Sequence, residues 1–427
     1  MNDGWTRRKF LTAAAAAGLG VLGPAVPRSR AQGATTSITV GMEAGSPYEK
    51  FYKALAPKFT AQTGISVNVL GTPHDSMRQQ FLLDAMSGTG SYDVYEADQP
   101  WVPEFDRRKF IVNLNDKLSQ ADKQDFIGNT LATVSYNGGI YALPFIVHNI
   151  VMYYRTDLFQ KAGINAPPAT WEEYRAVAKT LTDKGTGVWG TLIEGKQNGE
   201  VATRLHSFIQ QAGGDVVDKN NRPTLDSPAG LDALRLMTQI MFEDQTSPPG
   251  LLDLTDMQGM FLDGKFSMAP IWPYLYAIAS DPQQSKVAGK FAVDLPPGHP
   301  DRVGTIYSWG FCVSSASKHK DAAWEWVKWS TSTEVLAEFG TNQRSPVPRK
   351  SAVEKVNADP KVSDGDKQAI SKMVECVARS KTIPMVPQYP QIQEVLAVVT
   401  SSVMSKVQQP ADALKAGQKR LEGILKA

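Results

Sequence analysis

Residues 37–70 read S-I-T-V-G-M-E-A-G-S-P-Y-E-K-F-Y-K-A-L-A-P-K-F-T-A-Q-T-G-I-S-V-N-V-L, and this stretch decides the fold class. Residues 37–41 form a short run with β-branched side chains, which predicts a strand. Apolar side chains then recur at every fourth position, which predicts one face of a helix: Phe51, Leu55 and Phe59. Pro57 is expected to kink or interrupt that helix. Residues 65–70 predict a second strand.

The same alternation continues after residue 70. Residues 77–86 predict a helix, and residues 92–96 predict a third strand. Strands separated by helices are typical of an α/β fold whose sheet contains parallel strands. Further along, Thr170 can cap a helix while Glu173 reaches back to it, which is the capping-box pattern. No charge run or Gly/Ser-rich linker divides the chain, so we expect domains joined by short crossings of the chain.

The composition is that of a globular protein without an obvious catalytic signature. The chain has 427 residues, of which 42% are apolar and 21% charged, and this length suits two or three domains. The histidines have no metal-ligand spacing, and no phosphate-binding loop or nucleophile elbow occurs. We expect no metal and no cofactor, although the many carboxylates leave a glycosidase-type acid pair open. Cys312 and Cys376 either pair after export or are buried as small apolar residues.

Residues 1–33 have the pattern of an export signal. Arg7 and Arg8 precede a short apolar run, and small residues follow near Ala31 and Gly33. The arginine pair favours the twin-arginine route over a general secretory signal with two incidental arginines. We expect cleavage near Ala31 and Gly33, and a periplasmic protein. Cleavage removes five basic residues and one acidic residue from a chain with 45 basic and 43 acidic side chains, which leaves a net charge of −2. That charge favours neither nucleic acid nor an anionic membrane as a partner.

Tryptophans stand beside polar residues at the ends of predicted strands. Trp101 follows Asp98, and Trp309 lies in a second strand pattern. Residues 268–276 read M-A-P-I-W-P-Y-L-Y, and the prolines on both sides of Trp272 prevent a regular helix. A tryptophan held on such a segment is either part of the core or a flat platform for a ligand. In α/β sheets, ligands bind at the carboxyl ends of strands, so a platform there would face a cleft.

Longer segments carry a family pattern: F-T-A-Q-T-G-I-S-V (59–67), D-V-Y-E (93–96), Y-A-L-P-F-I-V-H-N-I-V-M-Y-Y-R-T-D-L-F-Q-K-A-G (141–163) followed by P-P-A-T-W-E-E-Y (167–174), and G-K-F-S-M (264–268) before Trp272. Together they resemble the extracellular solute-binding proteins of carbohydrate ABC transporters, the maltose-binding-protein group within solute-binding family 1. The resemblance covers essentially the whole chain after the export signal.

The resemblance implies a type II-like periplasmic binding protein with two α/β lobes, each a mixed sheet flanked by helices, and a hinge between them. We expect the chain to be divided into a first lobe at 34–147, a second lobe at 148–298, a return to the first lobe at 299–331, and helices of the second lobe at 332–427. The family closes around one ligand in the cleft and delivers it to membrane permease subunits. It implies a monomer without catalytic activity.

The resemblance and the local pattern together give the candidate binding residues. His148 and Asn149 fall where the family places a polar contact at the hinge, and Trp272 falls near its stacking tryptophan. We expect a ligand to stack on three tryptophans, which are Trp272, Trp309 and, as a weaker third, Trp101. We expect hydrogen bonds to the ligand from five polar residues, which are Glu43, Asp98, His148, Asn149 and Arg344.

Two departures from the family limit how far its binding residues carry over to this chain, and the second bears on the size of the ligand. The usual Gly-Pro-Trp is replaced by Pro270-Ile271-Trp272. The maltose proteins carry a further tryptophan after a Pro-Gln turn, and this chain has Ile392, Val395 and Leu396 at that place instead. We therefore expect a mono- or disaccharide, or a polyol of similar size, and not a long maltodextrin.

Two other functions stay open at this point. The same fold could bind an organic cation such as a polyamine, boxed by acidic and aromatic side chains: Glu43, Glu96 and Asp98 with Trp101 and Trp272. Alternatively, the protein could be a secreted carbohydrate-active enzyme. The sequence names neither the sugar nor the partner permease.

Overall fold

The computed structural model describes residues 36–299 and 302–426 of the chain, so the expected export signal lies outside the described residues. Within them, six strands form the first sheet in the order β11-β10-β3-β1-β2, with β6 paired to β10. These strands are β1 (Ser37–Glu43), β2 (Ser66–Thr72), β3 (Val94–Asp98), β6 (Leu143–Asn149), β10 (Thr305–Val313) and β11 (Lys381–Thr382). β1 is parallel to both β2 and β3, whereas β10 is antiparallel to β3 and β6. The expected α/β class with a mixed sheet is confirmed.

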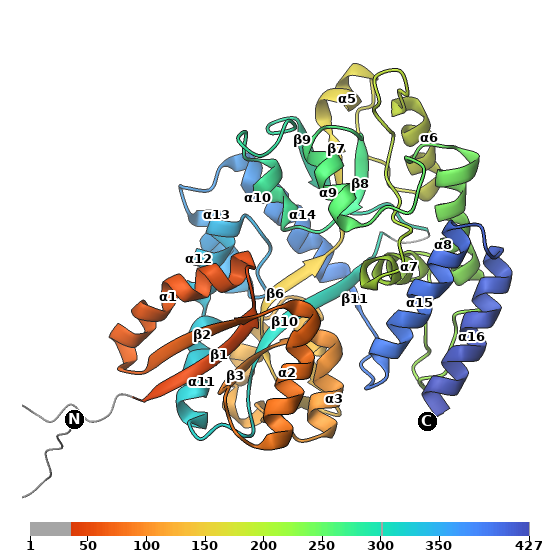
Figure 1. Cartoon of the computed structure of the whole chain (residues 1–427). Coiled ribbons are helices and arrows are strands. Elements are labelled where there is room, and N and C mark those ends of the chain that lie inside the picture. Colours follow the sequence, from red (N-terminus) through yellow and green to blue (C-terminus); the bar gives the residue numbers. More distant parts are fainter. Residues whose placement is uncertain (1–35, 300–301, 427) are drawn as a thin grey trace, which may run out of the picture. The chain divides into compact units, whose positions relative to one another are not determined.

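Helices surround this first sheet and complete what we call the first lobe (Figure 1). They include α1 (Pro47–Thr63), α2 (His74–Ser87), α3 (Val102–Arg107), α4 (Gln120–Asp125) and α11 (Lys320–Ser330), and a small hairpin of β4 (Ser135–Tyr136) and β5 (Gly139–Ile140) lies between them in sequence. Pro57 lies inside α1, which continues without interruption to Thr63 and is capped by Gly64. Rings from sheet and helices interlock in the core, where Phe145 stacks on Phe311 at 4.3 Å and Phe59 meets Trp326 edge to face at 5.2 Å.

A second, three-stranded sheet forms the centre of the second lobe. Its strands are β7 (Val151–Arg155), β8 (Met268–Ile271) and β9 (Phe291–Asp294), all antiparallel in the order β8-β7-β9. Successive side chains of β7 face opposite sides, so Met152 joins one apolar cluster while Val151 and Tyr153 join another. This short sheet is therefore buried on both faces.

Two groups of helices cover the faces of the second sheet. α9 (Leu254–Leu262) and α10 (Leu275–Ala279) bury side chains with Tyr153, and the larger group packs on the side of Met152. The larger group contains α5 (Thr156–Lys161), α6 (Trp171–Leu181), α7 (Gly199–Gln211), α8 (Pro228–Thr238), α15 (Tyr389–Met404) and α16 (Pro410–Lys426). The capping box predicted at Thr170 and Glu173 starts α6 and is confirmed.

The chain passes between the lobes three times. The first crossing is at Ile150, between β6 and β7, and the second joins β9 to β10. The third follows β11 and leads into α15. α14 (Asp364–Arg379) lies beside these crossings, because its Met373 packs in the second lobe while its Ile370 packs in the first.

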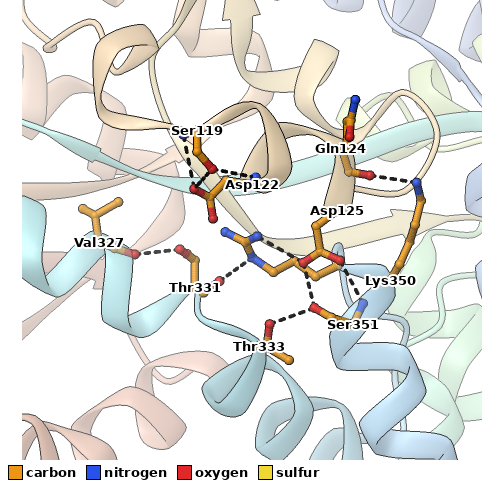
Figure 2. A network of polar contacts seen from close by, with 10 residues as sticks. Ser119, Asp122, Gln124, Asp125, Val327, Thr331, Thr333, Lys350 and Ser351 are labelled. Carbon is orange, nitrogen blue, oxygen red and sulfur yellow. Dashed lines mark hydrogen bonds and ion pairs between the residues drawn. The ribbon is translucent and has the colours of Figure 1, made fainter.

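The lobe boundary expected at residue 332 disagrees with the packing of the two helices that follow it. α12 (Thr333–Gln343) and α13 (Lys350–Ala358) bury Leu336, Phe339 and Val356 in the apolar core of the first lobe. Figure 2 shows a polar network that ties the start of α13 to α4, in which Asp125 accepts hydrogen bonds from the backbone N–H and the hydroxyl of Ser351 at 3.0 and 2.7 Å. We therefore assign α12 and α13 to the first lobe, because their apolar faces are covered there.

Both cysteines are buried and unpaired. Cys312 lies on β10 and Cys376 on α14, in different apolar clusters. Burial raises the pKa of both thiols, which keeps them protonated and unreactive. No helix among the described residues is long and apolar enough to cross a membrane.

Candidate functional site

A cavity of about 540 Å³ lies between the two lobes. The first lobe lines it from the carboxyl ends of β1 and β3, the turn after β3, the first turns of α1 and α2, and strands β6 and β10. The lining residues from this lobe include Glu43, Tyr48, His74, Arg78, Asp98, Trp101, Ile146, His148, Tyr307 and Trp309. The second lobe lines it from the start of α7, the segment after β8 and the start of α15, with Glu200, Thr203, Trp272, Tyr274, Pro390 and Gln393. The carboxyl ends of β1 and β3 meet at this edge of the sheet, which is the usual ligand position in α/β folds.

The cavity gathers six of the eight residues that the sequence nominated: Glu43, Asp98, Trp101, His148, Trp272 and Trp309. They come from five different segments of the chain, so only the fold brings them together. Contact with a ligand stays a prediction for each of them.

Asn149 and Arg344 do not reach the cavity, and both expectations need correction. The Asn149 side chain is fully buried, and its Nδ2 donates to the carbonyl of Cys376 at 3.2 Å and to the Ser380 hydroxyl, so it ties β6 to α14. Arg344 ends α12 in the left-handed conformation, with φ at 47°. Its Nε lies 3.5 Å from Asp366 Oδ2, in a separate polar crevice. Sequence position placed Asn149 beside His148, but alternation along β6 turns the two side chains to opposite sides.

Trp272 is held by a hydrogen bond and a ring contact, and it lies outside the apolar clusters. Its Nε1 donates to Glu200 Oε2 at 2.8 Å, and its ring meets Tyr307 edge to face at 5.6 Å. Only 8% of the residue is exposed, yet it belongs to none of the apolar clusters among the described residues. The Tyr153 hydroxyl donates to the carbonyls of Trp272 and Pro273, at 3.1 and 3.2 Å, and fixes the backbone of this segment.

Trp101 and Trp309 form an aromatic wall on the first sheet. Trp309 lies on β10 directly opposite Asp98 of β3, and its ring centroid is 6.0 Å from that of Trp101. The His74 ring lies 5.4 Å from Trp309. Trp101 is 6% exposed and packs with Phe105 in an apolar cluster. This wall is consequently part of the core of the first lobe as well as part of the cavity.

Carboxylates face the cavity from both lobes. Glu43 ends β1, Asp98 ends β3, and Glu200 stands in the first turn of α7, whose positive end favours a negative charge. Burial raises the pKa of Asp98 to about 7, and it also raises the pKa of Glu200. Asp98 is therefore close to its titration point at neutral pH, where it can donate or accept a hydrogen bond.

Glu96, which the sequence associated with a possible cation site, is not on the cavity wall. It is fully buried behind Glu43, whose backbone N–H donates to Glu96 Oε2 at 2.7 Å. Burial raises its pKa well above the usual range. Glu96 thus stabilises the end of β1 by accepting this hydrogen bond and does not line the cavity.

His148 lies at the end of β6, where the chain leaves the first lobe. It is buried, and its Nε2 is 3.2 Å from the Ser345 hydroxyl. Burial lowers the pKa of this imidazole to about 3, so the ring is neutral at neutral pH. A neutral ring can both donate and accept hydrogen bonds, which suits a ligand hydroxyl.

Several lining residues were not predicted: Tyr48, His74, Arg78, Glu200, Thr203, Tyr307 and Gln393. Asn198 caps the start of α7, and Glu200 and Thr203 follow it in the first turns. A capping residue predicts that a helix begins there, but it does not show that the start of the helix faces the cavity. Tyr307 is held from the second lobe, since its hydroxyl lies 3.2 Å from that of Tyr389, which is in turn 3.3 Å from His206 Nδ1. No pattern in the sequence signals a chain of contacts between residues so far apart.

The chain is similar to known bacterial binding proteins over most of its length. A family model described as bacterial extracellular solute-binding protein matches residues 44–337. A putative binding protein of Brucella abortus is 26% identical over 420 residues, which covers 96% of this chain and 97% of that protein.

Two solved structures share the arrangement of lobes. An ABC transporter solute-binding protein from Thermotoga lettingae, bound with alpha-D-tagatose, is 24% identical with a TM-score of 0.80, and the match covers 91% of this chain and 100% of that one. One from Agrobacterium radiobacter, in complex with ribitol, is 26% identical with a TM-score of 0.77, covering 91% and 98%. The expected two-lobed periplasmic binding protein fold is confirmed.

Proposed function

The chain belongs to the family of bacterial extracellular solute-binding proteins, and on this premise we propose that it is the substrate-binding component of an ABC importer for a small carbohydrate or polyol. The single observation that carries the proposal is the cavity between the lobes, which combines tryptophans with carboxylates, a neutral imidazole and amide and hydroxyl groups. The two solved structures, one in complex with ribitol and one bound with tagatose, support this class of ligand.

The lining suits the two kinds of surface that a sugar or polyol presents. Aromatic rings cover apolar C–H faces, and Trp272 and Trp309 offer such rings from opposite lobes. Hydroxyl groups need acceptors and donors, which Asp98, Glu200 and His148 supply. A micromolar ligand requires about −8 kcal/mol of binding free energy, which a stacking platform and several charge-assisted hydrogen bonds can provide.

The ligand is proposed to be short. From α15 only Pro390 and Gln393 line the cavity, while Ile392, Val395 and Leu396 are buried in the core of the second lobe. That helix therefore presents no aromatic platform for an additional sugar ring. A mono- or disaccharide, or a polyol of that size, is the ligand that this lining accommodates.

Binding is proposed to close the cleft. Because the two walls belong to different lobes, a ligand that touches both walls binds the closed form better than the open form. We propose that the closed, loaded form is the one presented to the permease, and that the protein itself catalyses no reaction. Saturating ligand should reduce the radius of gyration in solution scattering, and an unchanged radius at proven saturation would count against closure.

Export is proposed to follow the twin-arginine route into the periplasm, with loss of residues 1–33. The receptor of that route recognises the arginine pair, so Arg7→Lys combined with Arg8→Lys should leave the precursor in the cytoplasm. Fractionation followed by immunoblotting measures this. Normal periplasmic yield of the mature protein from the double variant would refute the route.

The function is tested by a thermal-shift screen of purified mature protein against monosaccharides, disaccharides, polyols, sugar phosphates and polyamines. A ligand that binds only the folded state raises the melting temperature by mass action. We expect shifts only from small carbohydrates and polyols, or from derivatives built on them. A shift from spermidine alone would support the organic-cation function instead, and turnover of a nitrophenyl glycoside would support an enzyme.

A further inference from the structure

A chain of polar contacts leads from the cavity wall into the second lobe. Tyr307 lines the cavity from β10, and its hydroxyl lies 3.2 Å from that of Tyr389 at the start of α15. The Tyr389 hydroxyl lies 3.3 Å from Nδ1 of His206 on α7, and Nε2 of that ring lies 2.8 Å from Asp215 Oδ1. Tyr389 and His206 are buried, while the Asp215 side chain is 33% exposed. We call these four residues the Asp215–Tyr307 chain, and it joins a cavity residue to a carboxylate near the surface.

The carboxylate at the far end of the chain is ionised and held in place. Asp215 also accepts hydrogen bonds from the backbone N–H of Val216 at 2.7 Å and from Gln210 Nε2 at 3.2 Å. Burial acts to raise the pKa of Asp215, but the hydrogen bonds from His206 and these donors outweigh it and lower the pKa below its usual range. An ionised carboxylate only accepts hydrogen bonds, so His206 Nε2 carries the proton between them. This contact fixes the imidazole ring with Nδ1 toward the next member of the chain.

A second set of contacts steadies the same part of β10. Gln210, which donates to Asp215, accepts a hydrogen bond from the Thr305 hydroxyl at 2.8 Å. Thr305 and Tyr307 are two positions apart on β10, so their side chains stand on the same face of the strand. Asp215 therefore supports this face of β10 at two points, directly beside the cavity and one pair of residues away from it.

The Tyr307 side chain depends on such support. Its ring packs against the apolar cluster of the second lobe and meets the Trp272 ring edge to face at 5.6 Å, although its backbone belongs to the first lobe. A phenol hydroxyl turns freely about its C–O bond, so its hydrogen-bond partners decide which direction it offers to a ligand. Networks of buried hydrogen bonds strengthen one another, so the fixed charge at one end affects the group at the other.

From this geometry we propose that Asp215 is a positioning residue for ligand binding. It does not touch the ligand, and it acts through the Asp215–Tyr307 chain to hold the Tyr307 hydroxyl toward a hydroxyl group of the ligand in the cavity. The inference rests on the proposed function, because the ligand that Tyr307 contacts is the proposed carbohydrate or polyol.

Calorimetric titration of the mature protein measures the effect. The probe is whichever of ribitol, D-tagatose, D-mannitol and maltose binds the wild type most tightly, or, if none of them binds, the carbohydrate or polyol with the largest shift in the thermal-shift screen. Asp215→Asn keeps the size of the side chain and loses its charge, so it should weaken binding about fivefold. Asp218→Asn is the matched control, because Asp218 is a partly exposed carboxylate between α7 and α8 that pairs with Arg222 outside the chain. Its affinity should stay within about twofold of the wild type.

A double-mutant cycle separates positioning from a general loss of stability. Tyr307→Phe removes the hydroxyl at the cavity end and should weaken binding about tenfold. Adding Asp215→Asn to it should then change the affinity by less than about twofold, because the group that Asp215 positions is already absent. A purely structural role would make the two losses add, and that result overturns the inference. Either single variant binding within twofold of the wild type overturns it too.

Tyr389→Phe decides the question if Asp215→Asn fails to fold. It removes one hydroxyl from the middle of the chain and keeps the buried ring, which packs in the apolar core of the second lobe. It should weaken binding about fivefold in the wild type and by less than about twofold beside Tyr307→Phe. Wild-type affinity in Tyr389→Phe, or a loss that adds to that of Tyr307→Phe, overturns the inference.

The two proposals fail in different ways. If a carbohydrate or polyol binds and the variants behave independently or like the wild type, the positioning role is overturned and the proposed function stands. If no carbohydrate or polyol binds the wild type, the proposed function falls and the inference falls with it.

Discussion

The wall that the first lobe gives to the cavity stands on a sheet, whereas the wall of the second lobe stands on a loop and the end of a helix. Trp101 and Trp309 lie beside the carboxyl end of β3 and pack against an apolar cluster. Trp272 follows the last residue of β8 and is oriented by its hydrogen bond to Glu200. Similar aromatic surfaces are therefore held differently, by packing in an apolar cluster on one side and by a hydrogen bond with a ring contact to Tyr307 on the other.

Burial alone does not separate a structural tryptophan from a functional one. Trp101 and Trp272 are 6% and 8% exposed, almost the same fraction. Their neighbours differ, since Trp101 packs with Phe105 and Trp272 contacts Glu200 and Tyr307. Removing the first should mainly weaken folding, and removing the second should mainly weaken binding.

The largest effect is expected for the first-lobe wall. Trp101→Ala leaves a cavity in the apolar cluster and should lower the free energy of unfolding by about 3–5 kcal/mol, the range for large aromatic residues in a core. Urea denaturation of the ligand-free protein measures this, and Trp101→Phe should lose clearly less. A loss below about 1 kcal/mol for the alanine variant would show that the first wall is not part of the core.

In the second-lobe wall, removal of the tryptophan should weaken ligand binding more than it weakens folding. Trp272→Ala should weaken binding of the best ligand by about 2–4 kcal/mol, the range of an interface hot spot, and should destabilise the protein less than Trp101→Ala does. Trp272→Phe keeps a ring but loses the hydrogen bond to Glu200, so an intermediate affinity is expected. Calorimetric titration gives the affinities, and a folded alanine variant with wild-type affinity would assign Trp272 to a packing role.

His148 lies near the end of β6, where the chain leaves the first lobe. Its lowered pKa predicts that the stability of the protein depends on pH. Its pKa is lowered to about 3 in the folded protein against about 6.5 in the unfolded chain, so the unfolded state takes up the proton first as the pH falls. Between pH 7 and 5 this residue should cost about 2 kcal/mol of stability. The raised pKa of Asp98 acts in the opposite direction, because its folded form holds the proton longer.

Comparison with His148→Gln isolates this contribution. The other titrating groups are present in both proteins, so the wild type should lose about 2 kcal/mol more than the variant between pH 7 and 5 in urea denaturation. Equal losses would show that the imidazole is accessible to protons in the folded state.

The smallest effect is expected outside both walls. Arg344→Ala removes an ion pair of a partly exposed side chain in a separate crevice, so affinity should change by less than about 0.5 kcal/mol. The same titration as for Trp272 measures it. A tenfold loss of affinity would mean that the crevice around Arg344 is coupled to ligand binding in the cavity.

The sequence predicted local structure and the family well, because both depend on short patterns. The strands at the start of the chain and the capping box of α6 follow from neighbouring residues, and so does the proline-held position of Trp272. Asn149 and Arg344 were misplaced because the side of a strand and the end of a helix decide where a side chain points. Glu200 was missed because its contact with Trp272 spans 72 positions.

The assignment of α12 and α13 shows the same limit at the level of lobes. Their amphipathic pattern fits any apolar surface, so the sequence does not say which lobe covers them. The contacts of Asp125 with Arg349 and Ser351 tie the start of α13 to α4 of the first lobe, and they join residues more than 200 positions apart. Tertiary contacts of this kind leave no local signal in a single sequence.

A crystal structure of the mature protein with its tightest ligand from the thermal-shift screen would show whether the ligand binds between the lobes. We predict ligand density inside the cavity between the lobes, with a C–H face against the Trp272 ring and a polar group within hydrogen-bond distance of Asp98 or Glu200. Density in the surface groove lined by Trp189 and Phe242, or in any place that touches only one wall, would contradict the account.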